Sequence, residues 1–247
     1  MRHFILTLAT VALLLPSLPA DAQMRATGSA ANEARRTLIA RVGEETLHFE
    51  APLGMCFVDP TKQGEREFYA NVRDFFTRKA DETLLGIFAP CQGLANMGSG
   101  GVNNPEGQVM STGLLLWPQR SVGNKLDLTL AEYLDLRAAS FEEYLGLTID
   151  AWSAASNVSL DPSLVVSDIE QLGPLERSDA AVSAVFAQEV RVGGEKHPLH
   201  LVGATTLLRD HPIEVALRLG RFAKDMEKEQ AHEFAQKFMA QQVALNR

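Results

Sequence analysis

The chain contains two cysteines, Cys56 in the stretch LGMCFVDP and Cys91 in IFAPCQGL. Two thiols can form a disulfide, bind a metal or act as a redox pair. A metal site would need further His or Cys ligands beside them, and a thioredoxin-like pair would need the spacing C-x-x-C. The sequence offers neither. We therefore predict a Cys56–Cys91 disulfide, which closes a loop of about 35 residues and contributes roughly 3–4 kcal/mol in the chain-entropy model.

Histidines and serines that could do catalysis fall in weak motifs. His197 and His200 lie three residues apart on an expected strand, which points their rings to opposite faces, and Pro198 excludes the helical alternative. Ser99 lies in GSGG, which lacks the Asp that precedes the nucleophile of exported serine proteases, and G-x-S-x-G is absent. We expect a turn at Ser99. If the chain is a hydrolase, Ser99, His197, His200 and His211 are the residues to inspect first.

Two further patterns have a structural and a chemical interpretation. The turn Arg209-Asp210-His211 could hold a ligand or cap a turn, and we favour the cap. His232 begins like a zinc-protease helix, but Gln236 stands where the second His would be, which favours a packing helix. The phosphate-binding and dinucleotide-binding glycine motifs are also missing. We expect no metal site, no cofactor and no catalytic residue.

The first 22 residues have the pattern of a signal peptide. Arg2 and His3 precede an apolar block from Phe4 to Leu15, and Ala20-Asp21-Ala22 fits a cleavage site. The apolar block is shorter than the roughly 20 residues of a membrane span. We expect a periplasmic or secreted protein without an integral membrane segment after cleavage. In such an oxidising space two lone cysteines usually pair.

Charge and length limit the partners and the organisation. The net charge is −8 with or without residues 1–22, which disfavours a nucleic-acid partner because that would need a basic face. Residues 23–35 are small and polar, and we expect a flexible lead-in there. No linker divides the rest, so we expect a single exported domain over residues 36–247. Its partner would be an unknown protein or small ligand.

The N-terminal half predicts a hairpin and a strand-helix-strand unit. Strands over 37–42 and 45–49 flank Gly43, and further strands are expected over 54–58 and 83–91. Asp59-Pro60 predicts the start of the helix between those last two strands. Such units make their strands parallel, which would bring Cys56 and Cys91 to one edge. Residues 92–111 carry the longest loop signal.

The C-terminal half predicts helices followed by a β-meander. After a strand at 113–118, capping boxes begin at Thr129 and Ser140 and predict helix from about 130 to 155, continuous or broken. Strands over 183–191, 198–208 and 213–219 are separated by turn residues, and an amphipathic helix over 224–245 follows. The fold class is therefore α+β, an antiparallel-rich sheet with flanking helices.

The C-terminal segments AVFAQEVRVGG, HPLHLVGATTLLRDHPIEVALRL and HEFAQKFMAQQVALN give the order of three strands and a helix. That order resembles the closing half of the PsbP/Mog1-type α/β sandwich, and GMCFVDP with IFAPC is similar to uncharacterised exported proteobacterial proteins. The resemblance implies a binding or accessory module and no shared catalytic residues. We therefore expect a non-enzymatic periplasmic binding or accessory protein. The alternatives are a small exported hydrolase and an assembly partner of a cell-envelope complex that uses the C-terminal helix.

Overall fold

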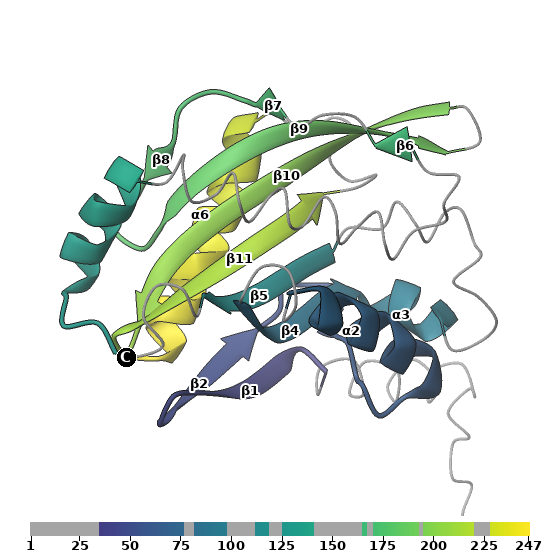
Figure 1. The fold of residues 1–247 in the computed structure, drawn as a ribbon, viewed down its shortest axis with the longest axis horizontal. Coiled ribbons are helices and arrows are strands. Elements are labelled where there is room, and N and C mark those ends of the chain that lie inside the picture. The colour runs from purple at the N-terminus through teal and green to yellow at the C-terminus, as the bar shows by residue number, and fades with distance from the viewer. Residues whose placement is uncertain are drawn as a thin grey trace, which may run out of the picture.

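A large antiparallel sheet organises the molecule (Figure 1). The computed structural model describes residues 35–76, 82–97, 112–118, 125–140, 165–166, 170–192, 195–219 and 228–247. The elements in chain order are β1 (Thr37–Val42), β2 (Glu45–Glu50), β3 (Met55–Phe57), α2 (Gln63–Phe75), β4 (Glu82–Pro90), α3 (Cys91–Met97), β5 (Thr112–Pro118), a helix of residues 130–140, β6 (Val165–Val166), β7 (Glu170–Gln171), β8 (Glu176–Arg177), β9 (Val182–Val192), β10 (Glu195–Leu208), β11 (His211–Leu219) and α6 (Lys228–Leu245).

The strand order of this sheet is β3-β4-β5-β11-β10-β9-β6, and the short strands β7 and β8 also pair with β9. Strands β1 and β2 form a separate two-stranded hairpin. All the pairs are antiparallel, and β9, β10 and β11 form the predicted meander. The predicted α+β class with an antiparallel-rich sheet and a closing helix is confirmed.

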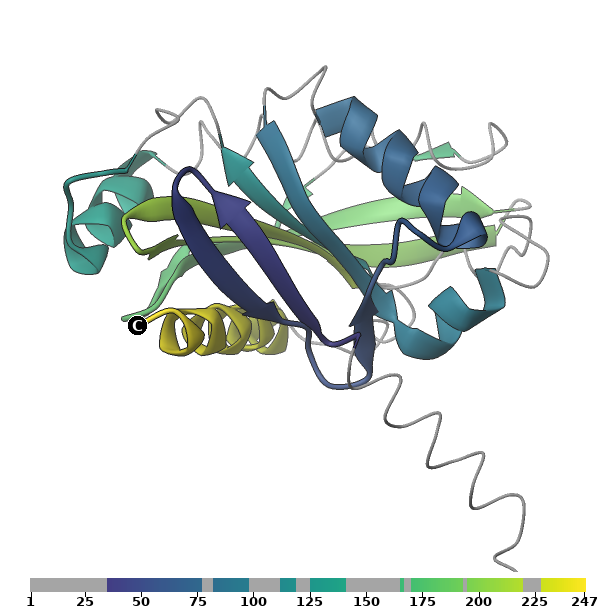
Figure 2. The same ribbon diagram turned by 90° about the horizontal axis from the view of Figure 1, so that it is seen from below.

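The sheet separates two hydrophobic cores. Figure 2 shows α2 above the sheet and α6 below it. One core lies on the face covered by α2, α3 and the helix 130–140, here called the α2 face; it includes Phe76, Leu94 and Leu134. The other lies on the face covered by α6 and the β1–β2 hairpin, here called the α6 face; it includes Leu47 and Phe238. Because successive strand residues point to opposite faces, each long strand contributes to both cores.

The predicted parallel arrangement of the strands around α2 is wrong. β3 pairs with β4 in antiparallel register, with Cys56 opposite Ala89 and Met55 opposite Pro90. The chain therefore enters β4 at the end of the sheet where it left β3. The disulfide is present all the same, because this register places Cys91 beside the start of β3, and the Cys91 amide donates to the Gly54 carbonyl at 3.0 Å.

Helix boundaries follow the local chemistry with two departures from prediction. The box at Thr129 forms as expected, because Glu132 accepts from the Thr129 amide at 2.8 Å and the Thr129 hydroxyl accepts from the Glu132 amide at 3.3 Å. Asp59 instead accepts from the amide and hydroxyl of Thr61, so α2 begins only at Gln63. The expected loop 92–111 begins with α3. Residues 98–111 and 141–164 lie outside the described residues.

The C-terminal helix α6 closes the outer edge of the hairpin with side-chain amides. Gln242 accepts from the Glu50 amide at 3.0 Å and donates to the Glu50 carbonyl at 3.1 Å. Asn246, one turn later, does the same for His48 at 2.8 and 2.7 Å. The two side chains therefore bond the main chain of β2 as a neighbouring strand would. A strand edge that offers its N–H and C=O groups to other chains is protected in this way.

Candidate functional site

The charged residues on the α2 face of the sheet form a buried network with the helix 130–140. Arg137 donates from Nη2 to Glu214 Oε1 at 2.6 Å, and both side chains are nearly inaccessible to solvent. Glu214 lies on β11, whose other residues are apolar except His211 and Arg218. A buried ion pair costs desolvation energy, which its own attraction has to offset, and removing either partner leaves an uncompensated buried charge.

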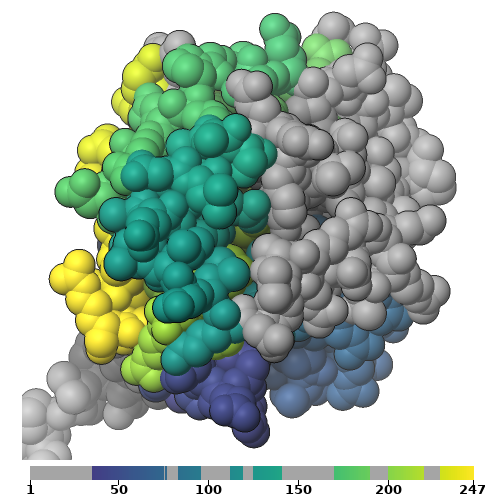
Figure 3. Space-filling model, turned by 60° about the vertical axis from the view of Figure 1, so that its left-hand side comes forward, coloured from purple at the N-terminus to yellow at the C-terminus, as the bar shows by residue number. Residues whose placement is uncertain are grey.

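A chain of hydrogen bonds extends this network into β10. The Arg137 Nε donates to the Tyr133 hydroxyl at 3.1 Å, and the hydroxyls of Tyr133 and Thr205 lie 2.7 Å apart. Thr205 donates onward to the Ile213 carbonyl at 3.3 Å, so Tyr133 is the donor to Thr205. Burial raises the pKa of Tyr133, which keeps the phenol protonated as this role requires. In Figure 3 the teal helix 130–140 covers the sheet on this side.

On the α6 face, a serine, a histidine and a carboxylate lie in line. Ser183 Oγ on β9 is 2.9 Å from His232 Nδ1 on α6, and His232 Nε2 is 4.0 Å from Glu176 Oε1. β8 places Glu176 here, because Glu176 is the cross-strand partner of Ser183. The order resembles a Ser-His-carboxylate triad with the two ring nitrogens exchanged. However, Ser183 is 0% exposed, so its hydroxyl has no access to a substrate and instead fixes α6 on the sheet.

The turn between β10 and β11 is the charged cluster at the surface. Arg209 and Asp210 have φ angles of +47° and +66°, the left-handed values that a two-residue hairpin turn requires and that non-glycine residues rarely adopt. Lys125 Nζ lies 3.4 Å from Asp210 and 3.5 Å from Glu45, and Arg209 Nη1 lies 3.5 Å from Glu45. We call these four residues, with His211, the turn cluster.

Neighbouring elements hold the turn in this conformation. The Leu126 amide donates to the Asp210 carbonyl at 2.7 Å, and Arg209 Nε donates to the Asn246 carbonyl at 3.1 Å. The two hairpin turns also meet, since a Cβ on Gly43 would lie 3.1 Å from His211 Cε1. Strained backbone that its surroundings keep in place is common at functional sites and also occurs in turns that have no such site. The prediction of a turn at 209–211 agrees with this structure.

His211 itself is buried beneath the charged residues. It is 2% exposed, and its ring lies edge-on to the Trp117 indole at a centroid distance of 6.1 Å. Burial lowers the pKa of His211; Lys125 acts in the same direction, and the carboxylates of Glu45 and Asp210 oppose it. The imidazole is therefore neutral at pH 7 and belongs to the packing of the turn.

The residues proposed for a hydrolase do not gather at one place. His200 and His211 point to the α6 face from opposite ends of the β10–β11 pair, because His200 is opposite Leu219 whereas His211 is opposite Leu208. Burial lowers the pKa of His200 as well. His197 lies on β10 opposite Val190, but its side chain is outside the described part, and so is Ser99. The structure thus brings no two of these four together among the side chains that it describes.

The described residues contain no group of three or more His, Cys, Asp or Glu side chains placed to hold a metal ion. They also contain no helix long and apolar enough to cross a membrane.

Sequence reasoning missed the buried polar residues of both faces. Glu214 carried a usable signal, because a charged residue inside HPIEVALRL requires a partner if the strand is central. Ser183 and His232 gave none, since they are 49 positions apart and meet only through the packing of α6 on β9.

Comparisons with known proteins leave the chain without an assigned family. No protein-family model matches it, and no curated protein does. A solved structure that matches is the solution structure of cyanobacterial PsbP (CyanoP) from Synechocystis sp. PCC 6803. The two chains are 13% identical, the match covers 79% of this chain and 84% of the other, and the TM-score is 0.34. The resemblance to exported proteobacterial proteins stays a prediction.

Proposed function

We propose that this protein is a non-enzymatic binding or accessory protein of an exported compartment, and that it contacts its partner through the turn cluster. The observation that supports this proposal is which of the charged and nucleophilic side chains are buried and which lie at the surface. Arg137 and Glu214 on one sheet face, and Ser183 and His232 on the other, are buried and join helices to strands, whereas the turn cluster presents charges at the surface. Glu45, Lys125, Arg209 and Asp210 are 32–55% exposed and fixed by bonds from several elements.

Export is supported by two independent features. The N-terminal residues have the signal-peptide pattern, and the Cys56–Cys91 disulfide suits an oxidising compartment, because cytosolic thiols are kept reduced. The turn cluster carries two basic and two acidic groups, so it fits a protein or small ligand with charges of both signs. The apolar stripe of α6, including Ala235 and Phe238, packs on the sheet, so an assembly role would have to use a surface other than that stripe.

Binding can be tested by charge reversal at the turn cluster. The mature protein and a Lys125→Glu variant would be immobilised and exposed to the exported fraction of the native cells. We expect a protein or metabolite that the unmodified chain retains and the variant does not. The matched control is Lys237→Glu, because Lys237 lies on the exposed side of α6 and pairs only with Glu233 among the described residues. Equal retention by all three chains contradicts a contact at the turn cluster.

One observation favours the hydrolase alternative, namely the line of Ser183, His232 and Glu176. A fluorophosphonate probe, which labels activated serines, separates the two functions. We expect no labelling of the mature protein, because the Ser183 hydroxyl is inaccessible. Labelling that disappears in a Ser183→Ala variant with unchanged thermal stability would establish the hydrolase instead.

A further inference from the structure

His211 is a buried histidine whose two ring nitrogens have no hydrogen-bond partner among the described residues. The residue is 2% exposed and lies on β11, a central strand that β5 and β10 flank. The Trp117 indole lies edge-on to the ring, and its Nε1 also lacks a partner in the described part of the chain. The site suits the uncharged imidazole, because a protonated ring would bury a charge and two N–H donors without a described acceptor.

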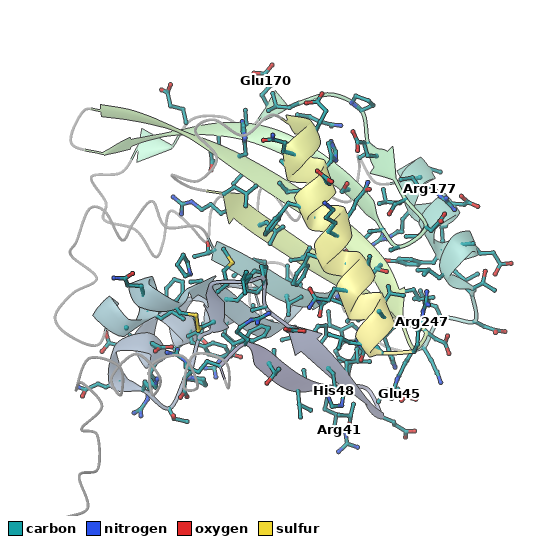
Figure 4. The ribbon with its side chains drawn as sticks, turned by 180° about the vertical axis from the view of Figure 1, so that it is seen from behind. Arg41, Glu45, His48, Glu170, Arg177 and Arg247 are labelled. Carbon is teal, nitrogen blue, oxygen red and sulfur yellow. A yellow bond between two sulfur atoms is a disulfide. The ribbon has the colours of Figure 1, made fainter. Side chains whose placement is uncertain are left out.

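The turn of the β1–β2 hairpin covers the His211 ring. A Cβ added to Gly43 would lie 3.1 Å from His211 Cε1 and 3.6 Å from its Nε2, so the hairpin backbone packs directly against the ring. Val42 and Leu47, on either side of the turn, are 0% exposed and belong to the core on the α6 face. Figure 4 shows Glu45 at this end of the hairpin. The hairpin turn therefore keeps water away from the ring.

The two turns that meet at His211 are held by different kinds of contact. The β10–β11 turn belongs to the large sheet and is fixed by a main-chain hydrogen bond of 2.7 Å at the Asp210 carbonyl. The hairpin turn is held by ion pairs of Glu45 at 3.5 Å and by a 3.5 Å bond to the Thr46 carbonyl, and exposed pairs of this kind contribute little. The side-chain amides of α6 bond β2 from His48 onward. The turn half of the hairpin, residues 40–47, is therefore the part that can move.

The charged groups around His211 come from three segments. Lys125 precedes the helix 130–140 and Glu45 belongs to the hairpin, whereas Arg209 and Asp210 form the β10–β11 turn. Lys125 pairs with both carboxylates, at 3.5 and 3.4 Å, and Arg209 pairs with Glu45. Burial has the largest effect and lowers the pKa of His211, Lys125 lowers it as well, and the two carboxylates raise it by less. The closed hairpin thus disfavours a protonation that the open hairpin permits, so pH values below the ordinary histidine pKa of 6.5 shift the balance toward opening until the lowered pKa is passed.

We propose that His211 is a pH-sensitive contact that releases the turn half of the β1–β2 hairpin in mild acid. At pH 7 the neutral ring packs beneath Gly43 and the hairpin is closed. Protonation turns the ring into a charge that requires hydration, and the hairpin turn lifts to admit water. The movement separates Glu45 from Lys125 and Arg209, so it takes the turn cluster apart. A partner bound at the turn cluster, as proposed above, would be released, but the opening itself does not depend on that function.

Hydrogen exchange of the mature protein, measured without any partner, tests the opening. A two-stranded hairpin is only marginally stable alone in water, so lifting it from the sheet exposes its amides. After correction for the intrinsic exchange rate, we expect the protection of a peptide covering 40–47 to fall at least about threefold between about pH 7.5 and 5.5. At the lower pH this peptide should be at least about tenfold less protected than β10, whose exchange requires the whole sheet to open. The range lies above the ordinary titration of carboxyl groups, at about pH 4.

Two glutamine variants assign the pH dependence to one histidine. His211→Gln removes the titrating ring, so the protection of residues 40–47 should no longer change between the two pH values. His200→Gln is the matched control, because His200 lies on the same sheet face at the other end of the β10–β11 pair and burial lowers its pKa as well. Its hairpin should respond to pH as the unmodified hairpin does. Circular dichroism verifies that each variant is folded.

Trp117 supplies a second measurement that leaves His211 unchanged. A Trp152→Phe variant retains Trp117 as its single tryptophan, and this indole lies against the His211 ring. We expect quenching of its fluorescence by acrylamide to increase as the pH falls and the hairpin lifts. Three results overturn the proposal: hairpin protection and quenching that do not change with pH, a pH response that persists in folded His211→Gln, or equal protection of the hairpin and β10 in acid.

Discussion

The hydrogen bonds of Gln242 and Asn246 to the main chain of β2 allow a stability change to be predicted. In Gln242→Leu the side chain keeps nearly the same volume but loses both hydrogen bonds to the Glu50 main chain. The third bond, to the Phe238 carbonyl, lies within α6, where that carbonyl already has a helical partner. The change therefore removes two bonds between the helix and the hairpin and leaves the apolar packing in place.

The expected loss follows from the number of bonds. A protein hydrogen bond contributes about 1–1.5 kcal/mol net, so two bonds correspond to a loss of roughly 2–3 kcal/mol in the free energy of unfolding. Gln242 is fully buried, so water does not replace the missing groups at no cost. For a chain of this size, the loss lowers the melting temperature by about 4–12 °C.

Urea unfolding followed by circular dichroism measures the free energy, and hydrogen exchange by mass spectrometry locates the change. We expect faster exchange in a peptide covering 45–50 and unchanged exchange in β10. Gln241→Leu is the matched control, because Gln241 donates at 2.7 Å to the Glu50 carboxylate and not to the main chain. Its cost should stay below about 1 kcal/mol, as for other partly exposed polar contacts.

Equal stability of the two leucine variants within 0.5 kcal/mol, roughly the spread of neutral surface changes, would contradict a structural role for the two Gln242 bonds. Unaltered hydrogen exchange in β2 of Gln242→Leu would contradict it as well.

Three further predictions concern separate parts of the molecule. Replacing Cys56 and Cys91 together by serine should lower the free energy of unfolding by about 3–4 kcal/mol, measured with urea against the oxidised chain. Gly113→Ala should abolish soluble expression, because its Cβ would lie 2.0 Å from Phe88 Cζ, and a second change Phe88→Leu should partly restore it. Stability should fall as pH drops below the unfolded histidine pKa of 6.5 and level off below the lowered pKa of His211, and His211→Phe should flatten that part of the profile.

Much of the architecture could be predicted because it depends on local pattern. The three long strands of the meander and the terminal helix are marked by alternating or helical apolar spacing and by turn residues. The capping box predicted from the four residues that begin at Thr129 is present in the structure. Whether two strands pair in parallel or antiparallel register is not decided by local sequence, as β3 and β4 on either side of α2 show. The disulfide was predicted correctly for a wrong geometric reason, since antiparallel register also brings Cys91 to Cys56.

The polar sites were less predictable because they are made by packing. Arg137 and Glu214 lie 77 positions apart and meet only because the helix 130–140 crosses β11. The turn at Arg209 and Asp210 was expected from residue types. The contacts of this turn with Glu45 and Lys125 depend on where the β1–β2 hairpin packs, which no spacing in the sequence predicts.

Strand β5 has a consequence for the order of folding. Among the described strands it lies between β4 and β11, and through it the N-terminal strands β3 and β4 join the meander. Its partner residues on β11 are separated from it by about a hundred positions, and contacts at such separations slow folding. Until β11 arrives, the pair β4–β5 has an open edge that another chain can occupy. The chain is therefore most vulnerable to misassembly in the interval between the formation of that pair and the docking of the meander.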